Sequence, residues 1–376
     1  MVKILHCADI HLDSAFVCGD ARKSVVRKNE LYSSFSSMMT YAKNNSVDIV
    51  LISGDLFDSE NVTRETASLL QREFADNPDC RFVIAPGNHD PFTENSIYSK
   101  TDFPPNVFIF KSTNVSHFSF DELNCDVYGY AFTSSCLNYN PFKGVKPQLN
   151  SRINIMCAHG DMLSNTSDNC PITVQDIKDS GFDYVALGHI HAGGAVQKTD
   201  DTYYAYSGCL EGRDFGECGY KGAILGTFEK EKCELKAEFK PLRFSKRRYE
   251  IEKLNISGAK GIADILPALK AVIDLKNYGT DTLLRVILEG DTAPDFVISD
   301  SSFQTVAERL FYLEIVNKSR PLFDLSNLEN DPTIRGAFYA ELKMQLMSED
   351  EEEREKAYAA LKYGLSALGG SNVIDF

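Results

Sequence analysis

The chain has 376 residues, a net charge of −15, 43% hydrophobic residues and 25% charged residues. These values are typical of a globular protein of two or three domains, and no apolar run approaches the roughly 18 residues of a membrane helix. The acidic balance argues against a protein that coats nucleic acid through bulk positive charge. It does not exclude a nuclease whose positive electrostatic field is local. The opening segment reaches Asp9 too early for a signal peptide, so we expect a cytoplasmic protein that does not associate with membranes.

The first stretch of the chain alternates short apolar strands with amphipathic helices. We predict strands at residues 2–7, 47–53 and 82–85, and helices at residues 25–43 and 62–74. This βαβαβ order predicts a sheet with helices packed on it.

From Val107 onward, the apolar strands follow one another without long helices between them. The predicted strands are residues 107–110, 127–130, 153–158, 184–187, 203–206 and 223–228. We expect them to form a second, mostly antiparallel sheet. An α/β fold with two sheets packed face to face, a β-sandwich flanked by helices, would account for the first domain, residues 1–240.

The composition then shifts toward basic residues, and a smaller αβ pattern follows. The basic side chains are Arg243, Lys246, Arg247 and Arg248. They could contact a DNA backbone, or they could form a solvated face between domains. The pattern beyond them predicts strands at 249–254, 282–288 and 313–317 and helices at 261–275 and 303–310. We interpret residues 246–325 as a small αβ cap domain.

The last part of the chain, residues 330–370, is predicted to be a helical tail. Asp331 and Pro332 indicate a helix start, with Asp as N-cap and Pro at the first helical position. The apolar positions of this helix are Ile334, Phe338, Leu342 and Leu346. A second helix opens with the acidic run 349–353, ends at Gly369-Gly370, and has apolar positions Tyr358, Leu361, Leu365 and Leu368.

The ten cysteines are scattered without a C-x-x-C pair. Several of them, such as Cys7 and Cys157, lie in apolar runs. We therefore expect no disulfide framework, and we expect most of the cysteines to be small buried hydrophobic residues.

Five short segments rich in His, Asp, Asn and Gly each follow a predicted strand. They are residues 9–11, 54–58, 87–90, 158–161 and 188–191. Each alone could be an ordinary turn, but loops at strand ends converge on one edge of a layered α/β fold. Their mixed imidazole and oxygen donors suit Mn, Fe or Zn better than Mg or Ca. Together they predict two divalent cations roughly 3.5–4 Å apart, the arrangement that hydrolyses phosphate esters.

The motifs D-x-H, G-D-x-x-D, G-N-H-D, H-G-D and G-H-x-H in residues 1–240 resemble those of the calcineurin-like metallophosphoesterases. The segments 6–14, 54–58 and 206–213 are similar to those of the bacterial SbcD / YhaO-type DNA repair exonucleases. The resemblance implies a metallophosphoesterase fold with a capping domain and a helical tail. It also implies a metal-dependent DNA exonuclease, in which hydroxide activated by two metals attacks the phosphodiester.

The resemblance assigns metal ligands one by one. Asp9, His11 and His191 would hold a first metal, Asn88, His159 and His189 would hold a second, and Asp55 would bridge them. The expected cofactors are two divalent ions, with Mn favoured and Fe or Zn as alternatives.

The resemblance also implies roles beside the metals. His89 would be the catalytic histidine, which stabilises charge at phosphorus or protonates the leaving oxygen. Asp58 and Asp90 would orient such groups from behind. The archaeal and eukaryotic repair nucleases usually carry His at the position of Asp58. Arg213 could touch the substrate phosphate or form a surface ion pair.

The expected partners are DNA and an SMC-like coiled-coil ATPase, onto which the tail helices would dock through their apolar positions. These helices could instead pack on their own domain, and a homodimer is a further candidate assembly. Two other functions stay open. The chain could be a phosphodiesterase or phosphatase that acts on a small nucleotide, or a non-catalytic interaction subunit.

Overall fold

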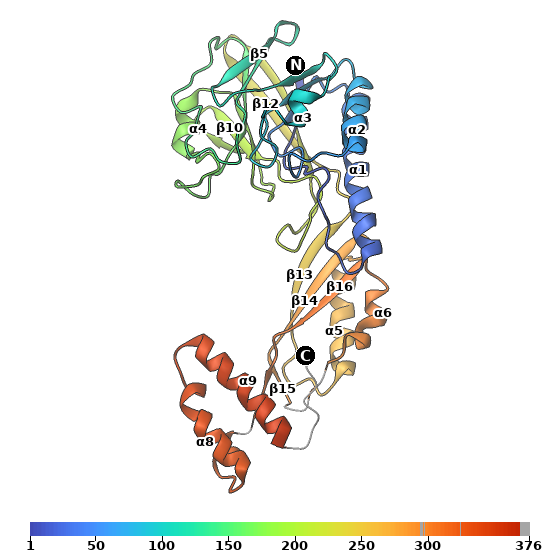
Figure 1. Ribbon diagram of the computed structural model, residues 1–376, viewed down its shortest axis with the longest axis vertical. Coiled ribbons are helices and arrows are strands. Elements are labelled where there is room, and N and C mark those ends of the chain that lie inside the picture. The colour runs from blue at the N-terminus through green and yellow to red at the C-terminus, as the bar shows by residue number, and fades with distance from the viewer. Residues whose placement is uncertain (294–295, 297, 324, 369–376) are drawn as a thin grey trace. The chain divides into compact units, whose positions relative to one another are not determined.

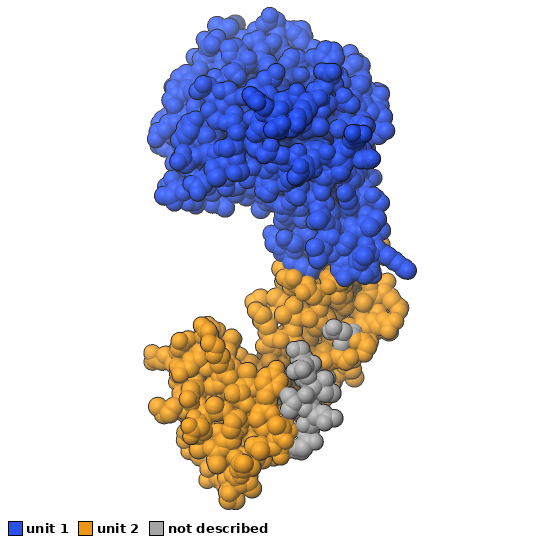
Figure 2. Space-filling model, in the orientation of Figure 1, with its two compact units in different colours: residues 1–249 blue, residues 250–376 orange. Residues whose placement is uncertain are grey.

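The computed structural model describes residues 1–293, 296, 298–323 and 325–368. The chain folds into two compact units, residues 1–249 and 250–376 (Figure 2). The predicted catalytic domain, residues 1–240, lies within the first unit. The predicted cap domain and tail lie in the second unit apart from residues 246–249. The helix end predicted at Gly369-Gly370 lies outside the described residues.

The first sheet of unit 1 has six strands in the order β12-β11-β1-β2-β3-β4. They are β1 (Val2–Cys7), β2 (Ile49–Ile52), β3 (Arg81–Ile84), β4 (Val107–Ile109), β11 (Gly222–Glu231) and β12 (Glu234–Arg243). Strands β1 to β4 run parallel, and β11 and β12 are antiparallel additions on the other side of β1. Parallel neighbours need crossover connections. Helices α1 (Ala21–Asn44), α2 (Arg64–Ala75) and α3 (Ile97–Lys100) lie in these connections (Figure 1).

The second sheet has the order β5-β6-β7-β8-β10-β9. Its strands are β5 (Ser116–Phe120), β6 (Cys125–Gly129), β7 (Ile153–His159), β8 (Tyr184–Gly188), β9 (Gln197–Thr199) and β10 (Thr202–Tyr206). Our prediction of a mostly antiparallel sheet was wrong, because the three inner pairs are parallel and only the two edge pairs are antiparallel. The strands predicted at 107–110 and 223–228 belong to the first sheet instead. The crossovers here are a loop, the short α4 (Val174–Ser180) and the segment that carries the edge strand β9, so no long amphipathic pattern marks them.

Side chains along each strand point alternately to its two faces, and this alternation produces a layered hydrophobic core. In β1, Leu5 and Cys7 point into the cluster that includes Leu31 and Phe35 of α1, while Ile4 points into the cluster between the two sheets. Side chains on successive strand positions point to opposite faces, so a fully apolar strand serves both layers. The predicted fold class, two sheets packed face to face and flanked by helices, is confirmed.

The second unit begins with a three-stranded sheet in the order β13-β14-β16. Its larger elements are β13 (Arg248–Asn255), α5 (Ile262–Leu275), β14 (Thr282–Glu289) and β16 (Tyr312–Asn317). Smaller elements are β15 (Asp291–Thr292), α6 (Gln304–Ala307), β17 (Arg320–Pro321) and α7 (Leu325–Glu329). The helix predicted at 303–310 is therefore much shorter than expected. Side chains of α5, including Ile265, Leu269 and Ile273, pack on the sheet.

The tail consists of α8 (Ile334–Leu346) and α9 (Glu351–Leu368). The predicted N-cap Asp331 with Pro332 at the first helical position was wrong. Thr333 caps α8 by accepting from Arg335 N, and Asp331 instead accepts from Thr333 N and Oγ1. The two helices pack on each other through a shared apolar cluster, whose buried members include Tyr339, Leu346, Leu361 and Leu365. Ile334 is 67% exposed and does not join it.

None of the helices within the described ranges has the length and the hydropathy of a membrane span. The ten cysteines all lie within those ranges, and none forms a disulfide. Seven of them are buried. Burial raises the pKa of the Cys157 thiol to about 12, which keeps it protonated and unreactive.

Candidate metal centre

The five motif segments lie at or just after the ends of β1, β2, β3, β7 and β8, and backbone hydrogen bonds join several of them. Asp9 N donates to Gly54 O (3.1 Å), and His11 N donates to Asp55 O (3.0 Å). These bonds hold the D-x-H and G-D-x-x-D segments side by side. His189 N donates to Asp9 Oδ1 (3.0 Å), which joins the segment after β8 to the segment after β1.

Two motif glycines lie directly against predicted metal ligands. A Cβ on Gly54 would lie 2.0 Å from His159 Nδ1, and Gly54 has a φ of +91°. A Cβ on Gly87 would lie 2.2 Å from Asp55 Oδ1. Any larger residue would therefore displace a predicted metal ligand.

Several predicted ligands have left-handed backbone conformations. The φ angles are 50° at Asp9, 49° at His11, 50° at Asp55 and 105° at His189. Such conformations in non-glycine residues cost on the order of 1–3 kcal/mol each and cluster at functional sites. The surrounding backbone hydrogen bonds hold these conformations, in which the ligand atoms of Asp9, His11 and Asp55 lie close together.

The first group of donors is Asp9, His11 and His191, whose ligand atoms lie within 4.8 Å of one another. The His11 and His191 Nε2 atoms are 3.2 Å apart. Each Nδ1 faces a carboxylate, with His11 Nδ1 3.1 Å from Asp58 Oδ1 and His191 Nδ1 2.5 Å from Glu217 Oε1. A neutral imidazole carries one N–H. Because each Nδ1 donates, both Nε2 atoms present lone pairs to each other, an arrangement that fits a cation.

The second group is Asp9, Asp55 and His159, again within 4.8 Å. His159 Nδ1 donates to Ser53 O (2.9 Å), and its Nε2 lies 2.9 Å from Asn88 Oδ1. Burial by itself lowers the pKa of His159. The carboxylates of Asp55 and Asp9 together outweigh burial and raise this pKa to about 9. Buried oxygen acceptors surround this imidazole and stabilise positive charge on it. They would stabilise a metal cation in the same way.

Asp55 faces both groups. Its Oδ2 lies 3.8 Å from His11 Nε2 and 3.4 Å from His159 Nε2, and its Oδ1 accepts from His89 N (3.0 Å). Burial opposes ionisation, but the neighbouring His159 holds the pKa of Asp55 below its usual value. A charged oxygen between two ligand sets is the geometry of a bridging ligand.

His189 lies beside the second group, with its ring centroid 5.3 Å from that of His159. Its ligand atoms are not within the 4.8 Å groupings formed by the described residues. Burial and the neighbouring His159 lower the pKa of His189 to about 4, which keeps its ring neutral and able to donate a lone pair. Its role as a ligand stays a prediction.

His89 is exposed, in contrast to the buried Asp9, His11 and His159. Its Nδ1 donates to Asp58 O (3.0 Å), and its ring lies edge-on to His11 at 4.9 Å. A hollow of about 440 Å³ in front of it is lined by Asp58, Asn88, His89 and polar neighbours such as Glu60 and Ser135. A substrate can therefore reach the side of the metal cluster where His89 stands.

Asp90 is buried and ties two of the segments together. It accepts from Gly87 N (2.7 Å), Phe57 N (3.1 Å) and Tyr98 Oη (2.6 Å). Burial, together with the charge of Asp55, raises the pKa of Asp90 to about 7. Asp90 therefore positions the backbone of the G-N-H-D loop.

Glu217 was not predicted from the sequence. It stands between two glycines in Gly216-Glu217-Cys218-Gly219, with no spacing that marks it as a partner of His191. Burial opposes its charge, but the hydrogen bond from His191 and the nearby Arg213 lower the pKa of Glu217 to about 2. It is thus a charged carboxylate directly behind a predicted ligand.

Arg213 joins the two supporting carboxylates. Its Nη1 lies 3.1 Å from Asp58 Oδ1, and its Nη2 lies 3.3 Å from Glu217 Oε1. A closed ring of contacts therefore runs from His11 through Asp58, Arg213 and Glu217 to His191. This internal ion pairing accounts for the position of Arg213, and its contact with substrate stays a prediction.

The predicted basic cluster lies elsewhere in the first unit. Arg247 pairs with Glu30 of α1 (2.6 Å), and Lys246 Nζ donates to Ser37 Oγ (3.2 Å). The guanidinium groups of Arg243 and Arg248 lie over the ring of Tyr220, at 3.3 and 4.8 Å from its centroid. Binding of DNA by these four side chains stays a prediction.

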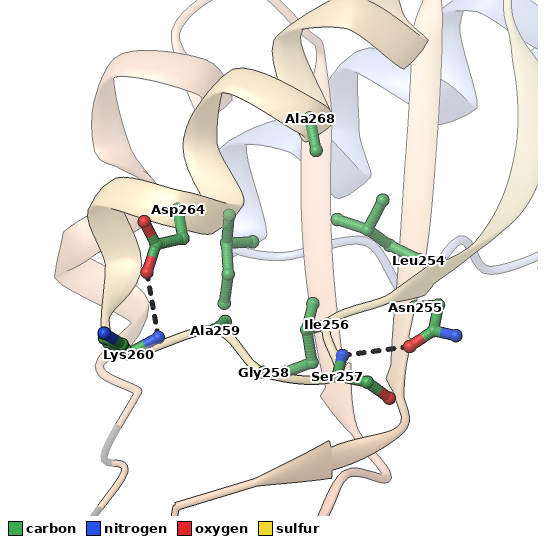
Figure 3. A pocket seen from close by; sticks show the side chains of 10 residues that line it. Leu254, Asn255, Ile256, Ser257, Gly258, Ala259, Lys260, Asp264 and Ala268 are labelled. Atoms are coloured by element: carbon green, nitrogen blue, oxygen red, sulfur yellow. Dashed lines mark hydrogen bonds between the residues drawn. The ribbon is translucent and has the colours of Figure 1, made fainter.

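A second hollow, of about 390 Å³, lies at the connection from β13 to α5 (Figure 3). Its polar groups pair locally, since Ser257 N donates to Asn255 Oδ1 and Lys260 N donates to Asp264 Oδ2. The carboxylate of Asp264 occupies the first turn of α5, where an anion would otherwise bind. This hollow gathers no cluster of catalytic side chains.

These features define a metal-dependent phosphoesterase, with a two-layered α/β core and a cluster of Asp, His and Asn at the strand ends. Residues 2–193 match the family described as Calcineurin-like phosphoesterase, and the chain belongs to this family. The chain is thus a hydrolase of the metallophosphoesterase type.

Two relatives match most of the chain. The metallophosphoesterase YhaO of Bacillus subtilis is 27% identical over 306 residues, covering 78% of this chain and 73% of YhaO. The DNA double-strand break repair protein Mre11 of Saccharolobus solfataricus is 24% identical over 307 residues, covering 77% of this chain and 76% of Mre11. Both similarities extend well beyond residues 2–193.

Proposed function

We propose that this phosphoesterase hydrolyses DNA phosphodiesters as an exonuclease in repair or recombination, with two divalent cations, manganese being the expected metal. The observation that carries the proposal is the pair of imidazoles, one buried and one partly buried, whose Nε2 atoms face each other at 3.2 Å beside two carboxylates. Similarity to Mre11 over 77% of the chain supports DNA as the substrate.

The residues divide into ligands and supports. Asp9, His11 and His191 would hold one cation, Asn88, His159 and His189 the other, and Asp55 both. When bound, the cations would polarise the phosphoryl oxygens and supply a nucleophile at neutral pH by lowering the pKa of water.

His89 would act on the substrate directly. Because its Nδ1 donates to Asp58 O, its Nε2 is left for the substrate. In the imidazolium form this nitrogen can donate to a charged phosphoryl oxygen or protonate the departing oxygen. Asp58 helps twice, since its carbonyl orients His89 and its carboxylate orients His11.

The test compares linear duplex DNA with bis-p-nitrophenyl phosphate, both with manganese. We expect both to be cleaved and the DNA to be shortened from an end. Rapid hydrolysis of the small diester with intact DNA would contradict the nuclease proposal and favour a small-nucleotide phosphodiesterase. Failure to cleave either substrate would favour a non-catalytic subunit.

We also propose that the tail docks onto a coiled-coil ATPase. Met344 of α8 and Met347, the C-cap residue of that helix, support this, because they are 80% and 67% exposed at a spacing of three residues. Much of the remaining apolar surface is already used between α8 and α9. Co-purification of the chain with a coiled-coil ATPase, lost in Met344→Glu, would test it. The cytoplasmic location and a homodimer stay predictions.

A further inference from the structure

The second unit contains a basic pocket, of about 380 Å³, between the β16–β17 connection and helix α9. Lys318 comes from the connection and Arg320 from the start of β17, and from α9 come Arg354, Tyr358 and Lys362. The three residues of α9 recur every four positions, so they share one face of the helix. We call the pocket formed by these residues, with Glu355 and Tyr363, the α9 pocket.

The charge of the α9 pocket is opposite to that of the chain. Four of its side chains are cationic and only Glu355 is anionic, in a protein of net charge −15. Glu355 pairs with Arg320 at 3.6 Å, with side chains 63% and 50% exposed. An ion pair so exposed contributes little to stability, so an incoming anion can replace the carboxylate.

The pocket also has a fixed floor and an aromatic rim. Arg354 is held at one end, where its Nη1 donates to Ser348 O (2.8 Å). Tyr358 packs partly into the cluster between α8 and α9, and Tyr363 is 43% exposed. Cationic side chains beside an accessible aromatic ring suit a ligand that alternates negative groups with flat rings.

We propose that the α9 pocket binds single-stranded DNA, with Lys318, Arg320 and Lys362 contacting phosphates and Tyr363 stacking on a base. Basic grooves combined with stacking aromatic rings are the general means of binding single strands without sequence preference. The choice of DNA rather than another polyanion rests on the proposed function. The pocket would retain a strand outside the catalytic centre, in a chain whose overall charge repels nucleic acid.

The experiment measures binding of a fluorescent oligothymidylate to the full chain by anisotropy in EDTA, at several salt concentrations. EDTA prevents cleavage and removes cations from the metal centre. The variants are Lys318→Gln/Lys362→Gln and Tyr363→Ala, and their melting temperatures confirm folding. The matched control is Lys356→Gln, on the same helix but outside the pocket, where Lys356 pairs with Glu352 at 2.6 Å.

We expect the double variant to bind more weakly and with a salt slope shallower by about 1.4, since each phosphate contact to a single strand contributes about 0.7. Tyr363→Ala should weaken binding about fivefold or more through lost stacking. Lys356→Gln should bind as the unaltered chain does. Equal affinity and slope in the double variant and the control would overturn the proposal, as would equally strong competition by polyglutamate.

A second readout separates this proposal from the proposed function. Turnover of bis-p-nitrophenyl phosphate with manganese should be unchanged in all these variants, because the diester does not need the α9 pocket. Loss of that turnover in the double variant would overturn the assignment of a separate binding site. If the unaltered chain binds oligothymidylate through the pocket but cleaves no DNA, only the nuclease proposal fails.

Discussion

The two predicted ion positions are supported in different ways. At the first, His11 and His191 are oriented by the carboxylates of Asp58 and Glu217, which Arg213 joins. At the second, His159 is oriented by the main-chain carbonyl of Ser53. One position thus depends on charged side chains, and the other depends on the path of the backbone itself.

This difference predicts which substitutions each position tolerates. A side-chain carboxylate can be replaced without moving the backbone, so the affinity of the first position can be changed by single substitutions. The second position should respond only to changes that move the backbone or the ligands themselves. The following variants test that distinction.

Asp55→Asn should have the largest effect, because this carboxylate faces both positions. Loss of its charge should release both cations and lower turnover by about 10³-fold or more, since metal stabilisation of the transition state amounts to several kcal/mol. Metal content measured by mass spectrometry, together with diester hydrolysis, checks this. Two tightly held cations with unchanged turnover would show that Asp55 does not bridge.

His89→Ala should lower turnover by roughly 10²–10⁴-fold, the usual contribution of a general acid or base. Both cations should stay bound, because the ligand groups do not need this ring. The measurement pairs hydrolysis rate with metal content. A variant that turns over normally would remove His89 from the chemistry, and one that loses metal would make it a ligand.

Gly54→Ala should disrupt the second position through the backbone. The new Cβ would lie 2.0 Å from His159 Nδ1. The alanine would also have to adopt the left-handed backbone conformation of Gly54. We expect a loss of about 2 kcal/mol or more in the free energy of unfolding, measured with urea, and loss of one bound cation.

The control for that variant is Gly144→Ala. Gly144 has a similar φ of +77° but no atom within 4 Å of an added Cβ. It separates conformational strain from the clash, and it should keep both cations. Equal destabilisation of the two variants would mean that contact with His159 is unimportant.

Glu217→Ala should have the smallest effect of the series and should be confined to the first position. Loss of a supporting carboxylate behind a histidine ligand lowers metal affinity or activity by about 10–100-fold. Titration with manganese should show one site weakened and one unchanged, with partial recovery in Glu217→Gln, whose amide oxygen can still accept from His191. Glu60→Gln, an exposed carboxylate of the neighbouring hollow, is the control. Equal weakening of both sites would contradict the separate support of the two positions.

Much of the fold could be predicted from the pattern of apolar residues in the sequence. The strands that lead into the motif segments were predicted, because buried strands are continuous apolar runs followed by turn residues. The direction of the second sheet was predicted wrongly, because its crossovers are loops and one short helix. The start of α8 was also missed, because Asp331 pairs with Thr333 instead of capping the helix itself.

The sequence by itself determined the kinds of donor in this protein, since imidazole, carboxylate and amide groups are properties of the residues. It also determined that each donor lies near the end of a strand. Only the tertiary structure decided that His11 meets His191 across a separation of 180 residues, and that Glu217 and Arg213 complete the ring around them. Such meetings depend on strand order and backbone hydrogen bonds, which no local spacing of residues encodes.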